Sequence, residues 1–347
     1  MRGAPTSPAD AYNRRVQHSP PLVPAFHRAR RAFLLAVILA TASCGARGEP
    51  ALAPVYDDTF WRVWGDGQAE VSGYSLRRPR YGEQRAGTLV LVFVTEPWSV
   101  SAHVKADEGK HPAGDVIQVL KQNAMESFQT GIYDYHMMTS SWTALTPAGG
   151  RPAGASAKLA FSAQEWCGTT WAELTFGPAG AQELVRSYFD GESGARTLDN
   201  PQGGTKSLVE DAVLVWARGL ASPLLARGGS TKVAFLPAVS RARLLHKPLA
   251  WTTATLAREP KTSTVTVPAG TFEVESATVT IAAGAAEEAR SLTVLVEAAA
   301  PRRIVKVTSS DGTMLELTGS MRTPYWQKNR EGDEALLRAL GTTGRQK

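Results

Sequence analysis

The run Thr88-Leu-Val-Leu-Val-Phe-Val-Thr95 is the stretch that decides the fold. Its side chains are almost all apolar and largely β-branched, which predicts a strand buried on both faces. Pro97 follows and predicts the end of that strand. Working outward, residues 69–76 predict the strand before it, and the segments after it predict shorter strands. Those segments are residues 100–105 and 116–121.

Short strands separated by turn residues continue along the rest of the chain. Residues 157–166, 169–176 and 182–190 predict a meander, and the Gly-, Asn- and Pro-rich residues 191–206 predict a linker. The dipeptide Asp311-Gly312 predicts a hairpin turn near the end. Strands of the second half are predicted at residues 231–236, 249–256, 262–267, 271–282, 291–297, 303–309 and 313–319.

One helix is predicted between the two β-rich halves. Residues 207–220 carry apolar side chains at helical spacing, and Ser207 with Glu210 has the spacing of a capping box. A short closing helix is predicted at residues 331–340. The domain plan is therefore a β-rich half (58–190), a linker and helix (191–229), a second β-rich half (230–323) and a tail (324–347). Long antiparallel meanders must curl, pack or close to protect their edges, so we expect two curved antiparallel sheets joined by the helix.

The first 43 residues predict a signal peptide. Basic Arg28-Ala-Arg-Arg31 precedes a short apolar run at residues 33–40, and this run is too short to span a hydrocarbon core of about 30 Å. Two processing sites remain open. Thr41-Ala-Ser-Cys44 is similar to a lipobox, with Thr41 in place of the usual Leu, and would give a Cys44 carrying palmitate-type acyl chains. Alternatively, cleavage after Ala42 would release a soluble periplasmic protein.

Location and partners follow from this signal. We expect a cell-envelope protein, anchored through lipid on Cys44 by a tether at residues 44–57 and facing the periplasm, with an outer-membrane position as one possibility. The net charge of +6 resides mostly in the signal peptide, where six arginines face one acid, Asp10. The remaining near-neutral chain lacks the basic surface that nucleic acid requires. We therefore expect a membrane, a lipid or an envelope protein as partner.

The first half concentrates aromatic residues that could line a ligand cavity or fill a core. We place His136 with this set, because it follows Tyr133 and Tyr135 closely and neighbours Asp134. The candidate ligand-lining residues are Tyr81, Trp98, Tyr133, Tyr135, His136, Trp142 and Trp166.

A candidate polar site is formed by Arg80, Glu83, Glu96 and Cys167. Cys167 with His136 is the alternative basis for a hydrolase or transferase, since a thiol nucleophile needs a nearby base. No Gly-x-Ser-x-Gly elbow, phosphate-binding loop or metal-ligand spacing occurs in the sequence. We therefore assign no catalytic residue, metal or cofactor.

Several motifs resemble a bacterial family of exported proteins of unknown function, whose members are often labelled septum formation inhibitor Maf. Maf pyrophosphatases themselves carry a Ser-Pro-Arg-Arg motif, which is absent here. Val267-Pro-Ala-Gly-Thr-Phe-Glu-Val274 is similar to DUF3108-type periplasmic proteins, which implies a curved half-barrel of the lipoprotein-carrier kind. The motifs of the first resemblance are residues 64–74, 80–83, 93–97, 128–140 and 164–168.

These observations lead to one leading expectation and two alternatives. The leading expectation is a noncatalytic β protein of the envelope that binds a hydrophobic ligand or an envelope partner. The alternatives are an enzyme that uses Cys167 and His136, and a structural envelope component.

Overall fold

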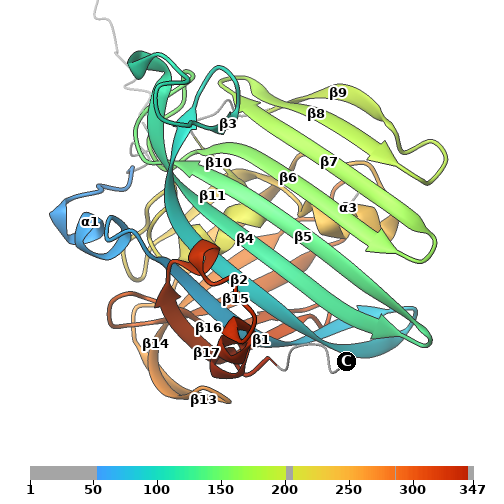
Figure 1. Cartoon of the computed structure of the whole chain (residues 1–347). Helices are drawn as coiled ribbons and strands as arrows, with labels where there is room; N and C mark the ends of the chain where they lie inside the picture. The colour runs from blue at the N-terminus through green and yellow to red at the C-terminus, as the bar shows by residue number, and fades with distance from the viewer. Residues whose placement is uncertain (1–52, 201–205, 286, 343–347) are drawn as a thin grey trace, which may run out of the picture. The chain divides into compact units, whose positions relative to one another are not determined.

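The computed structural model of the chain describes residues 53–200, 206–285 and 287–342 (Figure 1). Within these residues the protein is mainly β, with seventeen strands and a few short helices. The first half contains β1 (Ala69–Arg80), β2 (Glu83–Ser99), β3 (Val104–Lys105), β4 (Val116–Thr130), β5 (Tyr133–Ala144), β6 (Ser156–Glu165), β7 (Gly168–Gly177), β8 (Gly180–Ser187) and β9 (Gly194–Asp199).

The second half follows the same pattern of short strands. Its strands are β10 (Ser207–Val209), β11 (Ser230–Leu236), β12 (Thr252–Arg258), β13 (Ser263–Val267), β14 (Gly270–Ile281), β15 (Arg290–Glu297), β16 (Ile304–Ser309) and β17 (Met314–Thr323). The helices are α1 (Asp58–Trp64), α2 (Val213–Ala217), α3 (Val239–Leu245) and the 3₁₀ helices η1 (Ala113–Asp115), η2 (Glu210–Ala212), η3 (Tyr325–Gln327) and η4 (Asp333–Leu340).

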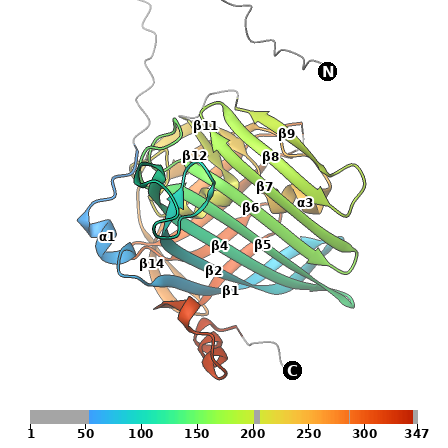
Figure 2. The same cartoon turned by 45° about the horizontal axis from the view of Figure 1, so that its top comes forward.

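All seventeen strands belong to one curved sheet rather than to the two sheets that we expected (Figures 1 and 2). Its main order is β9-β8-β7-β6-β5-β4-β2-β1-β17-β16-β15-β14-β12-β11-β10. The halves merge because β17 pairs with β1 from Ala69 to Arg77. Pairing is antiparallel except between β10 and β11. In the described residues β9 and β10 are the two edges, and the sheet is not closed.

The apolar run at residues 88–95 lies in β2, among the strands of the first half. Leu91 and Phe93 face the main core, while Val92 is buried on the opposite face, which confirms burial on both sides. The strand does not end at Pro97 but continues to Ser99. β1 pairs with β2 only as far as Phe93, so a missing N–H at Pro97 interrupts no bond to β1.

The C-terminal helix η4 covers the convex face of β1 and β17 (Figure 2). Gly73 and Gly319 are paired across these strands, and a Cβ on either would lie 2.2 or 2.1 Å from a carbonyl oxygen of η4. The two glycines therefore allow the helix backbone to lie directly on the sheet. Leu340 then buries Val92 from outside, and the predicted closing helix is confirmed as a 3₁₀ helix.

The predicted helix at residues 207–220 is largely wrong. Leu208 and Val209 belong to β10, and only the five residues of α2 are α-helical. Glu210 does not cap the helix predicted to follow it, because its carboxylate accepts the Ala238 N–H at the start of α3 and pairs with Arg290.

The predicted linker at residues 191–206 is also partly wrong, since it contains β9. None of the helices in the described ranges has the length and apolar character needed to span a bilayer.

A buried ion pair ties the two halves together behind β1. Both Nη atoms of Arg218 donate to the Glu70 carboxylate at 2.8 Å, and Nη2 also donates to the Pro301 carbonyl at 2.7 Å. The guanidinium lies 4.6 Å from the ring centroid of Phe93 and 4.9 Å from that of Trp64. These hydrogen bonds join β1, the residue after α2 and the segment before β16, so they restrain the centre of the large sheet.

Candidate ligand-binding site

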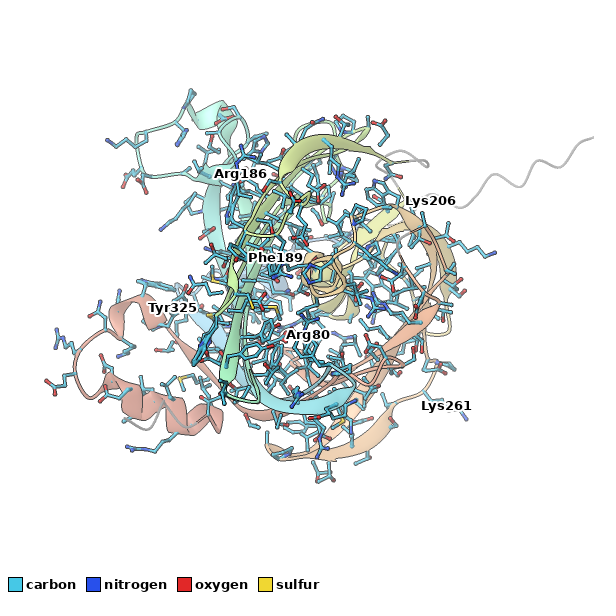
Figure 3. All side chains as sticks on the ribbon, turned by 90° about the vertical axis from the view of Figure 1, so that its right-hand side faces the viewer. Arg80, Arg186, Phe189, Lys206, Lys261 and Tyr325 are labelled. Carbon is cyan, nitrogen blue, oxygen red and sulfur yellow. The ribbon has the colours of Figure 1, made fainter. Side chains whose placement is uncertain are left out.

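A hollow lies between the concave face of β6–β9 and helix α3. We call it the seam cavity, because it sits beside the open edge β9. Its volume is about 620 Å³, within the usual range for small-molecule sites. Figure 3 looks toward this side of the molecule and labels Phe189, which lines the cavity.

A row of side chains across neighbouring strands forms the sheet wall of the seam cavity. Phe161 pairs with Ala172, Ala172 with Val185, and Val185 with Gly194. Because facing residues in register lie on the same side of a sheet, all four line the cavity. The small Ala172 and Gly194 leave the space that larger side chains would fill.

The opposite wall comes from α3 and the segment after it. Val239, Ala242 and Arg243 have the i, i+3, i+4 spacing of one helix face, and all three line the cavity. His246 ends the helix in the left-handed conformation, with φ of 52°. Leu249 completes an apolar wall opposite the sheet.

Arg243 is the main polar group beside this wall. Its side chain is 4% exposed and forms an ion pair with Glu165, while Nε donates to the Thr170 hydroxyl at 2.9 Å. Its guanidinium stacks on Phe189, 4.0 Å from the ring centroid. Glu165, Thr170 and Phe189 therefore fix the Arg243 side chain in place. Its positive charge is neutralised by Glu165 and is not available to a ligand in the cavity.

The loop between β8 and β9 is fastened to α3 at the cavity mouth. His246 Nδ1 lies 2.6 Å from a Glu192 oxygen, and the other Glu192 oxygen accepts a 2.6 Å hydrogen bond from Ser187. Burial raises the pKa of Glu192, but the hydrogen bonds from Ser187 and His246 outweigh it and leave that pKa lowered. Glu192 therefore stays ionised, and its contact with His246 connects the β8–β9 loop to α3.

The charges around the seam cavity balance. Glu183 pairs with Arg196 across β8 and β9, and Arg243 with Glu165. Asp190 and Lys247 add one charge of each sign at the mouth. A wall that combines the apolar row with paired charges suits an amphipathic molecule without a large net charge.

A second hollow, which we call the charged cavity, also lies on the concave face and has a volume of about 160 Å³. Arg290 pairs there with Glu210 and Glu287, and Arg78 donates to Glu126 at 2.6 Å. Asp211 accepts the Val239 N–H at 3.2 Å, and burial together with the Glu210 carboxylate raises its pKa to about 7. Its polar groups mostly bind one another, so it is an internal network rather than a ligand site.

The predicted ligand-lining residues do not line the seam cavity. Trp98 and Trp142 pack with their tilted ring centroids 5.2 Å apart, in a buried cluster on the convex face. Strand alternation explains this, since Trp142 lies on the same face as His136, opposite to the inward Tyr135. The other members, Tyr81, Tyr133, Tyr135 and Trp166, lie at or beside the tips of hairpins.

The predicted polar residues do not form one site either. Arg80 bonds to Tyr81, Tyr135 and the Leu244 carbonyl, whereas Glu83 pairs with Arg85. Glu96 lies far along β2 and accepts the Trp142 N–H at 2.8 Å. The exposed Cys167 occupies the β6–β7 turn.

His136 has partners on both ring nitrogens. Nε2 lies 2.6 Å from the Asp134 carboxylate and Nδ1 2.9 Å from the Ser127 hydroxyl. These interactions lie on the convex face, away from both cavities. They engage the ring nitrogens that activation of the Cys167 thiol would require. Among the described residues, no group of three acidic, histidine or cysteine side chains is arranged to hold a metal ion.

The seam cavity was missed because its lining carries little signal in the sequence. Ala172, Val185 and Gly194 are ordinary strand residues, and only their register creates the hollow. Helix α3 is short, and its first N–H groups are capped by Glu210 and Asp211 from a distant segment. Alternation in residues 169–176 and 182–190 was the one signal that could have identified the inward side chains.

Comparisons with known proteins give distant structural similarity. No protein-family profile matches the sequence, and no curated protein matches it. A beta-barrel-like protein of the domain of unknown function DUF1849 from Brucella abortus aligns over 74% of this chain and 98% of its own, with 8% identity and a TM-score of 0.44. A DUF1089 family protein from Pseudomonas aeruginosa aligns over 67% and 88%, with 9% identity and a TM-score of 0.26.

Proposed function

We propose that this protein is a noncatalytic binding protein of the cell envelope, which holds an amphipathic small molecule in the seam cavity. The observation that carries the proposal is the apolar row of Phe161, Ala172 and Val185 facing α3 across about 620 Å³. An apolar body fits between these walls, and polar atoms of the ligand would lie at the mouth near Glu192 and Lys247.

The envelope location in this proposal comes from the sequence. The signal peptide supports export, and Cys44 supports an acyl anchor that faces the periplasm. The one curved sheet is compatible with a half-barrel of the lipoprotein-carrier kind, in which the concave face holds the ligand. Mass spectrometry of the protein extracted from membranes tests the anchor, because acylation adds the mass of fatty acyl chains to Cys44.

A filled cavity tests the binding site. Ala172→Trp places an indole in the centre of the apolar row, so we expect the affinity for the uncharged fluorescent probe N-phenyl-1-naphthylamine to fall by about tenfold or more. Thr169→Trp is the matched control, because residue 169 is exposed and lies on the other face of the same strand. Equal probe binding by both folded variants would contradict the proposal.

A further inference from the structure

Four consecutive hairpins end along one side of the sheet, and each tip carries a large exposed apolar side chain. These hairpins are β1–β2, β4–β5, β6–β7 and β8–β9, whose tips lie at the right of Figure 1 and toward the viewer in Figure 3. We call this set the hairpin rim, and its apolar residues are Tyr81, Ile132, Trp166 and Tyr188.

Exposure sets the rim apart from the rest of the surface. Its residues are 57, 81, 69 and 68% exposed in chain order. Apart from Val55, every other large apolar side chain in the described ranges is less exposed, and the next is Trp326 at 46%. Large apolar side chains are usually buried in a folded protein. Four adjacent tips that expose them therefore indicate a surface that contacts an apolar partner.

Tight turns and side-chain contacts hold the residues of the hairpin rim in defined positions. Tyr81 and Gly82 both have positive φ values, 55° and 75°, which form a tight turn at the first tip. The Tyr81 hydroxyl lies 2.9 Å from that of Tyr135, and the Tyr133 and Trp166 rings are 6.4 Å apart. At the last tip the Tyr188 ring lies against Gly168, where a Cβ would approach it to 2.4 Å.

Cations without carboxylate partners surround these tips. Arg77, Arg186 and Lys247 are exposed and form no ion pair with a described residue. Two further acids lie near the tips, namely Asp190 in the β8–β9 loop and Asp134, which contacts His136. Glu83 and Glu192 are bonded to Arg85 and His246, so the three cations exceed the two acids. The excess of positive charge favours a negatively charged surface.

We infer that the hairpin rim docks on the surface of an anionic lipid bilayer. Tryptophan and tyrosine favour the membrane interface, because an apolar ring can enter it while the polar atom stays hydrated. Separate tips spaced by polar backbone suit shallow insertion better than they suit a protein interface, which needs a continuous apolar centre.

The rim and the seam cavity share one loop. Tyr188 is at the tip, while the next residue, Phe189, and Glu192 line the cavity. Docking would therefore place the mouth of the cavity near the headgroups. The inference stands on the rim alone and does not require that the cavity holds a lipid.

Vesicle flotation tests the inference with the Cys44→Ser protein from which residues 1–42 have been cleaved, so that neither an acyl anchor nor the basic signal peptide contributes. We expect binding to vesicles of phosphatidylglycerol mixed with phosphatidylcholine, and weaker binding to phosphatidylcholine alone. Trp166→Ser combined with Tyr188→Ser should lower the partition coefficient about tenfold or more, because two interfacial anchors are lost. Trp326→Ser is the control, since it removes an exposed tryptophan outside the rim, and near-ultraviolet circular dichroism verifies folding.

Two results would overturn the inference. One is an unchanged partition coefficient in the folded rim variant. The other is an absence of vesicle binding, together with crosslinks to protein from a photoreactive residue placed at position 166 in cells. Ala172→Trp separates this surface from the proposed binding function, because filling the cavity should leave vesicle binding unchanged.

Discussion

The seam cavity and the charged cavity lie on the same concave face but use opposite chemistry. Ala172 and Val185 line the first, which keeps about 620 Å³ open beside the edge strand. The second is reduced to about 160 Å³, and Arg290 in its wall pairs with both Glu210 and Glu287. The two cavities therefore have different roles. The ion pairs of the charged cavity connect distant segments and stabilise the fold, and the seam cavity leaves room for a ligand.

The largest expected effect comes from breaking the charged cavity. Arg290→Met leaves the buried Glu210 carboxylate without a cation, while Glu287 keeps its pair with Arg241, so the free energy of unfolding should fall by about 3–5 kcal/mol. Urea denaturation measures this change. Lys306→Met removes the more exposed pair with Glu316 and should cost less than about 1 kcal/mol. Equal losses in the two variants would contradict the assigned role of the network.

Asp211 makes the charged cavity sensitive to pH. Burial first, and then the Glu210 carboxylate, raise its pKa to about 7 from 3.8, so the folded state binds the proton more tightly than the unfolded state. Its contribution to stability is therefore present at low pH and is lost as pH rises from about 4 to about 7. Asp211→Asn should flatten this dependence by about 1–4 kcal/mol, because each pKa unit is worth about 1.4 kcal/mol.

Urea denaturation of wild type and Asp211→Asn across that pH range makes the comparison. Asparagine can still accept the Val239 N–H that Asp211 accepts. A pH dependence that is identical in both proteins would show that Asp211 does not titrate there.

Loss of the contact between His246 and Glu192 at the seam cavity should have a smaller, local effect on stability. His246→Ala removes the 2.6 Å contact with Glu192, which fastens the β8–β9 loop to α3. Amide hydrogen exchange in residues 189–193 should then accelerate about two- to tenfold, while exchange in β2 stays the same, because only local opening becomes easier. Faster exchange in both segments would instead indicate general destabilisation.

The smallest effect is expected at Cys167. The thiol is exposed in a turn and lines neither cavity, so Cys167→Ser should change the free energy of unfolding by less than about 0.5 kcal/mol. Affinity for N-phenyl-1-naphthylamine should also be unchanged. A loss of that binding would show that the turn contributes to the cavity.

Much of the strand content was predictable from sequence. The expected strands at residues 231–236 and 291–297 agree with β11 (Ser230–Leu236) and β15 (Arg290–Glu297), because alternation between apolar and polar side chains reports the two faces of a strand. Helix α3 was not predicted, since its capping carboxylates come from Glu210 and Asp211, which are distant in sequence. The single sheet was not predicted because pairing of β1 with β17 joins opposite ends of the chain.

The candidate site was harder to predict than the fold. Aromatic residues suggested a cavity, but Trp166 lies at a hairpin tip and Trp142 lies on the convex face. The cavity itself depends on the register that aligns Phe161, Ala172 and Val185, and no local pattern encodes that register.

Native mass spectrometry of the protein released gently from membranes tests the central claim most directly. The wild type and Thr169→Trp should retain a noncovalent amphipathic adduct, and Ala172→Trp should lose it while remaining folded. The same adduct on all three proteins, or no adduct on the wild type, would contradict the assignment of the seam cavity as a ligand-binding site.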